Sequence, residues 1–195
     1  KPPSAVIDGI SADGGLFVPE TLPKLDYHAL LGLDYAARAD AVLRGFFDFD
    51  VSGVAKAAYA SFDGDPAPVI KLDDRLYMLE LWHGATCAFK DMALSVLPRL
   101  LPRAKAAKGN ADKTLVLVAT SGDTGKAALE GFKDVDGTSV CVFYPTDGVS
   151  RVQKLAMQTQ SGANVLAVGI TGNFDDAQAA VKRAFADTEL KVRLA

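Results

Sequence analysis

Short apolar runs and amphipathic stretches alternate along the second half of the chain. Runs rich in β-branched residues occupy 114–119, 138–144 and 165–170, and helical patterns follow them over 125–133, 149–160 and 175–187. Continuous apolar strands separated by helices are typical of a parallel sheet covered on both faces, and right-handed crossovers then fix its topology. The pattern therefore predicts an α/β fold with a three-layer αβα domain around a parallel sheet.

The first seventy residues carry a different, mainly helical pattern. Turn signals at 13–15 and 19–23 precede two alanine-rich helical stretches, 35–47 and 51–62. The Asp, Gly and Pro cluster at 63–68 is typical of a linker. We therefore expect a smaller, mainly helical N-terminal region over residues 1–70 and the α/β domain over residues 71–195.

Within the second part, upstream of the three apolar runs, we expect a strand at 76–81 and a helix from about Asp91. Pro98 and Pro102 follow within that helical pattern. Proline lacks a backbone donor and clashes with the preceding turn, so these two residues are expected to kink or end the helix.

The composition narrows the class of partner. The 195 residues are 49% hydrophobic and 23% charged, and the formal net charge is -3 with no long basic run. Such a chain lacks the basic surface that nucleic-acid binding requires. Its apolar runs are far shorter than the roughly 20 residues that cross a bilayer, and no apolar targeting segment opens the chain. We expect a small-molecule partner, no membrane association and a cytoplasmic location.

The two cysteines and two histidines do not form a recognisable site. Cys87 and Cys141 are far apart and belong to no Cys-x-x-Cys or Cys/His cluster, so we expect buried, reduced thiols. His28 and His83 lack metal-ligand spacing, which favours packing or loop roles and predicts no metal site.

A polar loop, Thr120-Ser121-Gly122-Asp123-Thr124-Gly125, joins a predicted strand to a predicted helix. Unpaired amides and the positive end of the helix dipole favour an anion there, and glycine lets it approach the backbone. The loop predicts a carboxylate or phosphate site, with a simple capped turn as the alternative. It is not a nucleotide P-loop, because Thr120 and Ala127 stand where that motif requires Gly and Ser or Thr.

Lys90 closes the segment 83–90 and precedes Asp91 at a predicted helix start. The helix dipole disfavours a cation there. With apolar Phe89 and Met92 beside it, this position would favour the neutral amine that attacks an aldehyde. The alternative is an ordinary solvent-exposed lysine.

The segment 172–176 looks at first like a second phosphate loop. Asn173 is a good helix N-cap, however, and Asp175 and Asp176 put negative charge in the first helical turn, where they would repel phosphate. We therefore predict a capped helix start here and no phosphate cradle.

Three segments, in this order, resemble the threonine synthase family. They are 13–20, 83–91 and 120–125, and the stretches 143–145, 148–154 and 172–178 are also similar. The resemblance covers essentially the whole chain and identifies it as an N-terminal portion. The family consists of pyridoxal 5'-phosphate (PLP) enzymes of the tryptophan-synthase-β-like group, with fold type II.

The resemblance implies a carbon–oxygen lyase of threonine biosynthesis that converts O-phospho-L-homoserine and water into L-threonine and phosphate. Lys90 would hold PLP as a Schiff base and move protons at the substrate's α and β carbons. Ser121, Gly122, Asp123 and Thr124 would bind the substrate's α-carboxylate. Asp123 would also lie near the cofactor's 3'-oxygen, where relatives often carry Asn.

The resemblance leaves the two phosphates without assigned ligands. Thr86, Lys126 and Lys154 are all candidates for the substrate's phosphate, and the sequence does not choose among them. By the resemblance, the cradle for the PLP phosphate and the group facing the pyridine nitrogen would lie in a later, large cofactor domain, which we expect to be absent from this chain. We therefore expect little turnover from the 195 residues alone.

Two alternatives remain open from the sequence. One is a PLP-dependent phospho-lyase that removes phosphate from a similar substrate and releases a keto acid. The other is an inactive fragment or a binding module built on the same scaffold. The sequence carries no indication of an oligomeric state.

Overall fold

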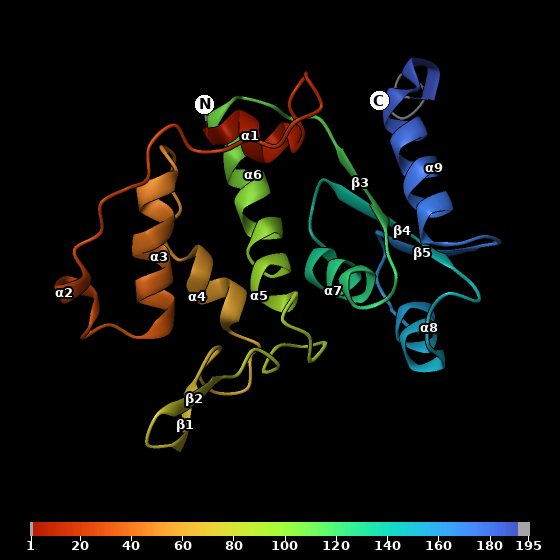
Figure 1. The fold of residues 1–195 in the computed structure, drawn as a ribbon. Helices are drawn as coiled ribbons and strands as arrows, with labels where there is room; N and C mark the ends of the chain where they lie inside the picture. Colours follow the sequence, from red (N-terminus) through yellow and green to blue (C-terminus); the bar gives the residue numbers. More distant parts are fainter. Residues whose placement is uncertain (1, 191–195) are drawn as a thin grey trace. The chain divides into compact units, whose positions relative to one another are not determined.

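A computed structural model describes residues 2–190, which form two compact units interleaved in the sequence (Figure 1). Within the described residues, the helical unit comprises 2–84 and 95–111, and the sheet unit comprises 85–94 and 112–190. The predicted boundary near residue 70 coincides with none of the points where the chain passes between the units. The division into 1–70 and 71–195 therefore stays a prediction.

Helices form most of the first unit. They are α1 (Pro2–Asp8), α2 (Tyr27–Leu30), α3 (Tyr35–Phe46), α4 (Val54–Tyr59) and α6 (Leu97–Ala107). Val51, Val54 and Leu100 are buried at its centre, where α4 packs on α6. The two predicted alanine-rich helices are confirmed as α3 and α4, although α4 is shorter than predicted.

The N-terminus of α4 is capped from a neighbouring helix. Gly53 stands at the N-cap position and has no side chain to offer. Asp40 of α3 instead accepts the amides of Gly53 and Ala55 at 2.8 and 2.9 Å. The carboxylate is only 9% exposed. These two charge-assisted bonds satisfy it and tie α3 to α4.

The predicted interruption at Pro98 is confirmed, but Pro102 does not end a helix. Helix α5 (Asp91–Leu94) stops before Ser95, and α6 begins at Leu97 with Pro98 in its first turn. Pro102 lies inside α6, which continues to Ala107. Only one intrahelical bond is lost there, and burial of the neighbouring Leu101 and Ala104 helps to stabilise the helix.

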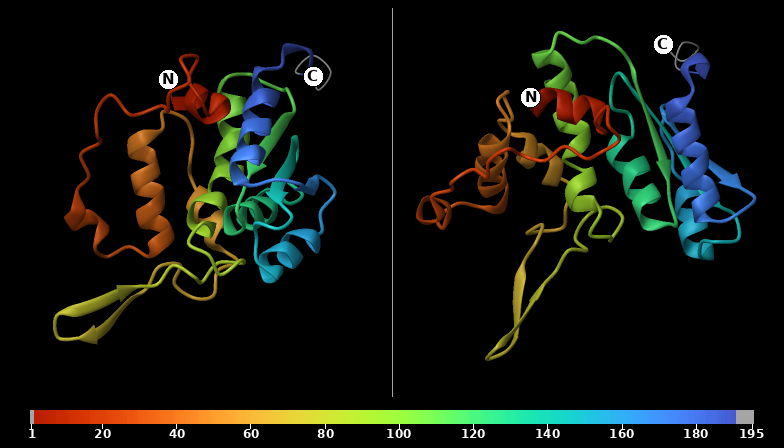
Figure 2. Two further views of the ribbon diagram at one scale, coloured as in Figure 1. Left: turned by 45° about the vertical axis from the view of Figure 1, so that its right-hand side comes forward. Right: turned by 45° about the horizontal axis from the view of Figure 1, so that its top comes forward.

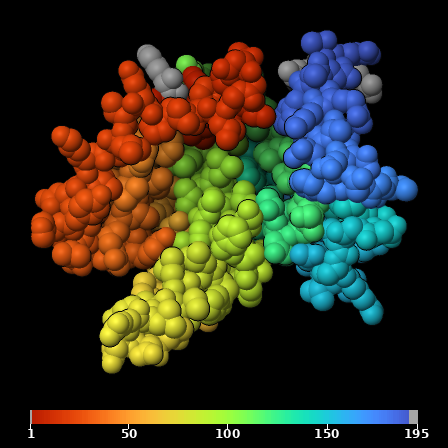
Figure 3. All heavy atoms as spheres, in the orientation of Figure 1, coloured from red at the N-terminus to blue at the C-terminus, as the bar shows by residue number. Residues whose placement is uncertain are grey.

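Strands β1 (Val69–Asp73) and β2 (Leu76–Leu79) form an antiparallel hairpin. The strand predicted at 76–81 is thus confirmed, but it pairs only with β1 and belongs to the helical unit. Every residue of both strands is exposed, including apolar Leu72 and Tyr77, and Figure 3 shows the hairpin's yellow atoms at the surface. A two-stranded hairpin is marginally stable by itself, and exposed apolar strands favour association.

The sheet unit is built on three parallel strands in the order β3-β4-β5. They are β3 (Thr114–Ala119), β4 (Thr138–Pro145) and β5 (Val165–Ile170). The central strand β4 buries Val140, Val142 and Tyr144 almost completely. The three predicted strands are confirmed, and two of them have the predicted bounds.

Helices cover both faces of this sheet (Figures 1 and 2). Helix α7 (Asp123–Phe132) packs on β4 and on α8 (Arg151–Gln158), whereas α9 (Phe174–Ala186) contacts β3 and β4 from the other face. The predicted three-layer α/β unit and the mainly helical region before it are confirmed. None of the helices within residues 2–190 has the length and apolarity needed to cross a membrane.

The core between α7 and the sheet yields a prediction about stability. Phe132 is 1% exposed, so Phe132→Ala is expected to lower the free energy of unfolding by about 3–5 kcal/mol through lost burial and a cavity. Phe185→Ala on α9 is a matched control, because that ring is 45% exposed and should cost less than about 1.5 kcal/mol. Urea unfolding followed by circular dichroism measures both, and equal losses would contradict this assignment of the core.

Candidate functional site

The loop between β3 and α7 is fixed by one buried hydroxyl. Thr120 is 2% exposed, and its Oγ1 accepts the amides of Gly122 and Gly125 at 3.0 and 2.9 Å. Its own amide donates to the Phe143 carbonyl at 3.0 Å, which ties the turn to β4. The chain therefore passes from strand to helix in one defined conformation.

Two glycines permit that conformation. Gly122 has φ 146°, and a Cβ there would lie 2.4 Å from the amide group of Gln153. At Gly125, a Cβ would lie 2.4 Å from Cγ2 of Thr120 and 2.7 Å from Cγ1 of Val142. Glycine is required at both positions, once for the backbone angle and once because α7 lies so close to the sheet.

The first turn of α7 offers open amides. Among the hydrogen bonds of residues 2–190, none is donated by the amides of Ser121, Asp123 or Thr124. The Gly122 amide is already used by Thr120, so Gly122 offers close approach rather than a donor. Three unpaired N–H groups at the positive end of a ten-residue helix are suited to an anion such as a carboxylate.

Lys90 lies at the start of α5, as predicted. Its carbonyl accepts the Leu94 amide, and its side chain is half-buried with Nζ 4.5 Å from the centroid of the Phe89 ring. Phe89 is 60% exposed and does not enclose the amine, contrary to our expectation. None of the ion pairs within residues 2–190 involves Lys90. Helix α5 packs against α7, so the lysine segment and the loop helix belong to one unit.

The Asp91 carboxylate, whose role our interpretation of the sequence missed, stabilises the turn that carries Lys90. Asp91 is 4% exposed and accepts both the amide and the hydroxyl of Thr86, at 2.8 and 2.7 Å. These bonds bridge the turn that carries Cys87 and Lys90. The signal in the sequence was a Thr five positions before an Asp at a helix start, but that pairing is too common to be diagnostic.

The three candidates for a phosphate ligand have different surroundings. Thr86 is bound to Asp91, and Lys126 is paired with Glu130 at 3.3 Å and with Gln160. Lys154 has no ion-pair partner among the residues that the structure describes. Within the described residues, Lys154 is therefore the one candidate of the three whose side chain makes no hydrogen bond or ion pair.

The histidines and cysteines are placed outside any metal cluster. His83 binds Glu80 at 2.8 Å and stacks on Trp82 within the helical unit. Cys141 is half-buried, and burial raises the pKa of its thiol. Cys87 is exposed, so the prediction of two buried thiols was wrong for it: the turn bridged by Asp91 directs its side chain outward. Residues 2–190 contain no group of three or more potential ligands placed to hold a metal ion.

The capped helix start predicted at 172–176 is confirmed. Asn173 accepts the Asp176 amide at 3.0 Å, and Asp176 accepts the Asn173 amide at 2.8 Å, which forms a capping box at the start of α9. Side-chain oxygens thus take two of the amides at this helix start, and Asp175 and Asp176 add negative charge to its first turn.

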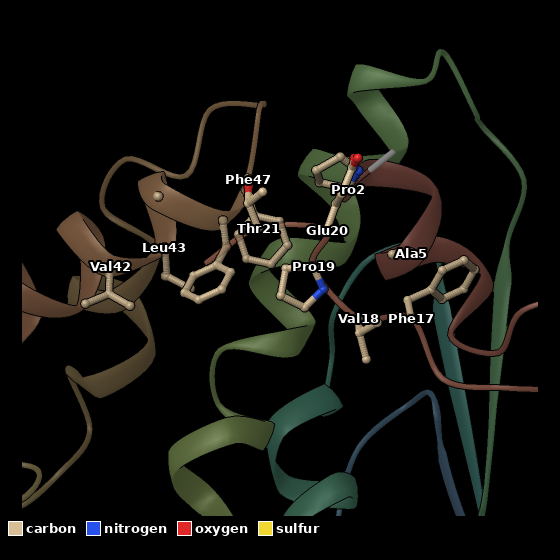
Figure 4. A pocket seen from close by; sticks show the side chains of 12 residues that line it. Pro2, Ala5, Phe17, Val18, Pro19, Glu20, Thr21, Val42, Leu43 and Phe47 are labelled. Atoms are coloured by element: carbon tan, nitrogen blue, oxygen red, sulfur yellow. The ribbon is translucent and has the colours of Figure 1, made fainter. Parts of the chain in front are cut away.

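The helical unit contains a cavity of about 810 Å³ between α1, the segment 17–21 and the C-terminal part of α3 (Figure 4). Apolar side chains such as Phe17 and Leu43 form most of its lining, and Glu20 is its only titratable one among the described residues. Among the described lining residues, Glu20 therefore has no second titratable side chain with which to carry out acid–base chemistry. We place the candidate site in the sheet unit, at Lys90 and the 120–125 loop.

Comparison with known proteins identifies the family. The family model for the threonine synthase N terminus matches residues 3–59. Threonine synthase of Pseudomonas aeruginosa is 40% identical over 191 residues, which cover 93% of this chain and 40% of that protein. PLP-bound threonine synthase from Brucella melitensis has a TM-score of 0.88 at 36% identity, covering 99% of this chain and 43% of that one. The chain belongs to the threonine synthase family.

A further threonine synthase, from Saccharomyces cerevisiae, is 35% identical over 206 residues and is covered to 40% by this chain. The chain thus spans about 40% of the length of these curated threonine synthases. The resemblance inferred from the motifs is confirmed, including its assignment to the N-terminal portion of the family.

The buried hydroxyl of Thr120 gives a prediction for the 120–125 loop. Thr120→Val keeps the shape but leaves the buried Gly122 amide without an acceptor and the Gly125 amide with only the Gly122 carbonyl, at 3.1 Å, which should cost about 1–3 kcal/mol. Hydrogen exchange at Gly122 and Gly125 should accelerate accordingly, as measured by NMR. Thr120→Ser retains the acceptor and should keep exchange slow. Slow exchange in the valine variant would show that the hydroxyl does not hold the loop.

Proposed function

We propose that the chain is the lysine-bearing portion of a PLP-dependent threonine synthase, which converts O-phospho-L-homoserine and water into L-threonine and phosphate. The observation that carries the proposal is a lysine without an ion-pair partner in the described region, located in the same unit as the open amides of α7. Identity of 40% to a threonine synthase over 93% of the chain supports it.

The residues present fit two parts of the chemistry. Lys90 would hold PLP through its amine, and Asp123 would lie near the cofactor's 3'-oxygen. When bound, PLP supplies an electron sink for negative charge at the substrate's α carbon. The capping box at Asn173 does not suit the cofactor's phosphate, which would be held by the part of the family's length that this chain does not cover.

The 120–125 loop would orient the substrate. Its α-carboxylate would accept the amides of Ser121, Asp123 and Thr124, helped by the hydroxyls of Ser121 and Thr124, while Gly122 allows close approach. Fixing the carboxylate fixes the α carbon relative to Lys90, whose amine would take and return protons at the α and β carbons. The bond from Thr86 to Asp91 would keep the lysine segment in place during these transfers.

Lys154 is our choice for the substrate's phosphate, because the side chains of Thr86 and Lys126 are engaged within the protein. The ammonium group would attract the dianionic leaving group as the β,γ part of the substrate reacts. We further propose that the parent enzyme has fold type II and works in the cytoplasm, as the resemblance implies.

The role of Lys90 is tested in the full-length protein by Lys90→Ala. The variant is expected to lose the visible absorbance of lysine-bound PLP and about 10²- to 10⁴-fold in turnover, the usual contribution of an acid–base residue. Lys182→Ala is a matched control on α9, where the exposed amine donates a hydrogen bond to Gln178 at 3.4 Å, and should behave as wild type. Unchanged absorbance and turnover in Lys90→Ala would overturn the proposal.

Product analysis tests the reaction itself. Full-length protein supplied with O-phospho-L-homoserine should release L-threonine and phosphate in equal amounts. Release of 2-oxobutanoate with ammonia would instead identify a phospho-lyase. The 195-residue chain alone should show little or no turnover, because the cofactor's phosphate would lack its anchor.

A further inference from the structure

Gln153 links the start of α8 to the start of α7. Its side-chain Oε1 accepts a hydrogen bond from the Ser150 backbone amide at 3.1 Å, and the backbone amide of Gln153 donates to Ser150 Oγ at 3.2 Å. These two bonds form a capping box. Its Nε2 donates to Oδ1 of Asp123 at 2.9 Å. One side chain therefore satisfies a helix cap with one end and holds a carboxylate of the candidate site with the other.

The position of this amide group is strongly constrained. The capping box fixes the carbonyl end, which directs the NH₂ end toward Asp123. Gly122 packs against the same group so closely that a Cβ would lie 2.4 Å from Nε2 and 2.8 Å from Oε1. The contact between Gln153 and the loop is thus built by both partners and does not depend on one freely rotating side chain.

The carboxylate held by Gln153 stands beside the open amides. Asp123 is the first residue of α7, where an acidic side chain would be attracted by the helix dipole. It nevertheless caps no amide of that helix among the described residues, and its carboxylate instead accepts a hydrogen bond from Gln153. If it turned back, it would occupy the amides of Asp123 and Thr124 or repel an incoming anion.

We propose that Gln153 is a positioning residue for the substrate's α-carboxylate, and this inference rests on the proposed function. By holding the Asp123 carboxylate toward α8, Gln153 keeps the first-turn amides of α7 open for the substrate. A neutral donor is required at this position, because a carboxylate in its place would face Asp123 with a like charge. Gln153 itself touches neither the reacting atoms nor the cofactor in this account.

Two substitutions in the full-length, PLP-loaded enzyme separate this role from simple helix capping. Gln153→Glu retains the acceptor that completes the capping box but replaces the donor to Asp123 with a negative charge. Gln153→Ala removes both. A purely structural role therefore predicts that Gln153→Glu is nearly harmless and Gln153→Ala is worse. Our proposal predicts the reverse order.

The primary measurement is the equilibrium Kd for the product L-threonine, by calorimetry. Gln153→Ala is expected to raise Kd by about 10-fold or more, as for loss of a hydrogen bond to a charged group, and Gln153→Glu by more. KM for O-phospho-L-homoserine should rise in parallel, with a smaller change in kcat. An unchanged Kd in Gln153→Glu would overturn the proposal.

Asp123→Asn provides the decisive combination. When Asp123 is neutral, it no longer repels the substrate, so the double variant Gln153→Ala/Asp123→Asn should bind L-threonine more tightly than Gln153→Ala alone. Additive losses would contradict the proposal. The visible absorbance of lysine-bound PLP is recorded for each protein, so a failure of Lys90 to hold the cofactor, which concerns the proposed function, is distinguished from a failure of this inference.

Discussion

The candidate site depends on the two hydrogen bonds that the buried Thr120 hydroxyl accepts. By accepting the amides of Gly122 and Gly125, the hydroxyl turns the chain from β3 into α7 within three residues. The same bonds use two amides internally and leave those of Ser121, Asp123 and Thr124 open. Close packing of Gly125 on Val142 then fixes the helix against the sheet. The site's donors are thus set by strand and helix geometry rather than by a flexible loop.

Local signals in the sequence predicted the elements of the sheet unit well. The runs 114–119 and 165–170 become strands with the predicted bounds, because continuous apolar segments rich in β-branched residues and separated by helices are typical of a parallel sheet covered on both faces. Asn173 and Asp176 form their cap from residues three positions apart. Such features depend on neighbours in the sequence, which is why pattern and spacing revealed them.

The remaining features arise from residues distant in the sequence. The bonds from Asp40 to the α4 amides and from Gln153 to Asp123 join positions that only the tertiary structure brings together. The interleaving of the two units has the same origin, since the segment carrying Lys90 packs with α7. The helical pattern correctly placed Lys90 at a helix start, but Phe89 does not bury the amine as expected, because its ring is exposed.

Lys90 is the residue proposed to hold the cofactor. Borohydride reduction of the full-length, PLP-loaded protein fixes the cofactor covalently to whichever lysine holds it, and peptide mass spectrometry then locates the added mass. We predict stoichiometric labelling of the peptide containing Cys87 and Lys90. Labelling of Lys126, Lys154 or any other lysine, with Lys90 unmodified, would contradict the account.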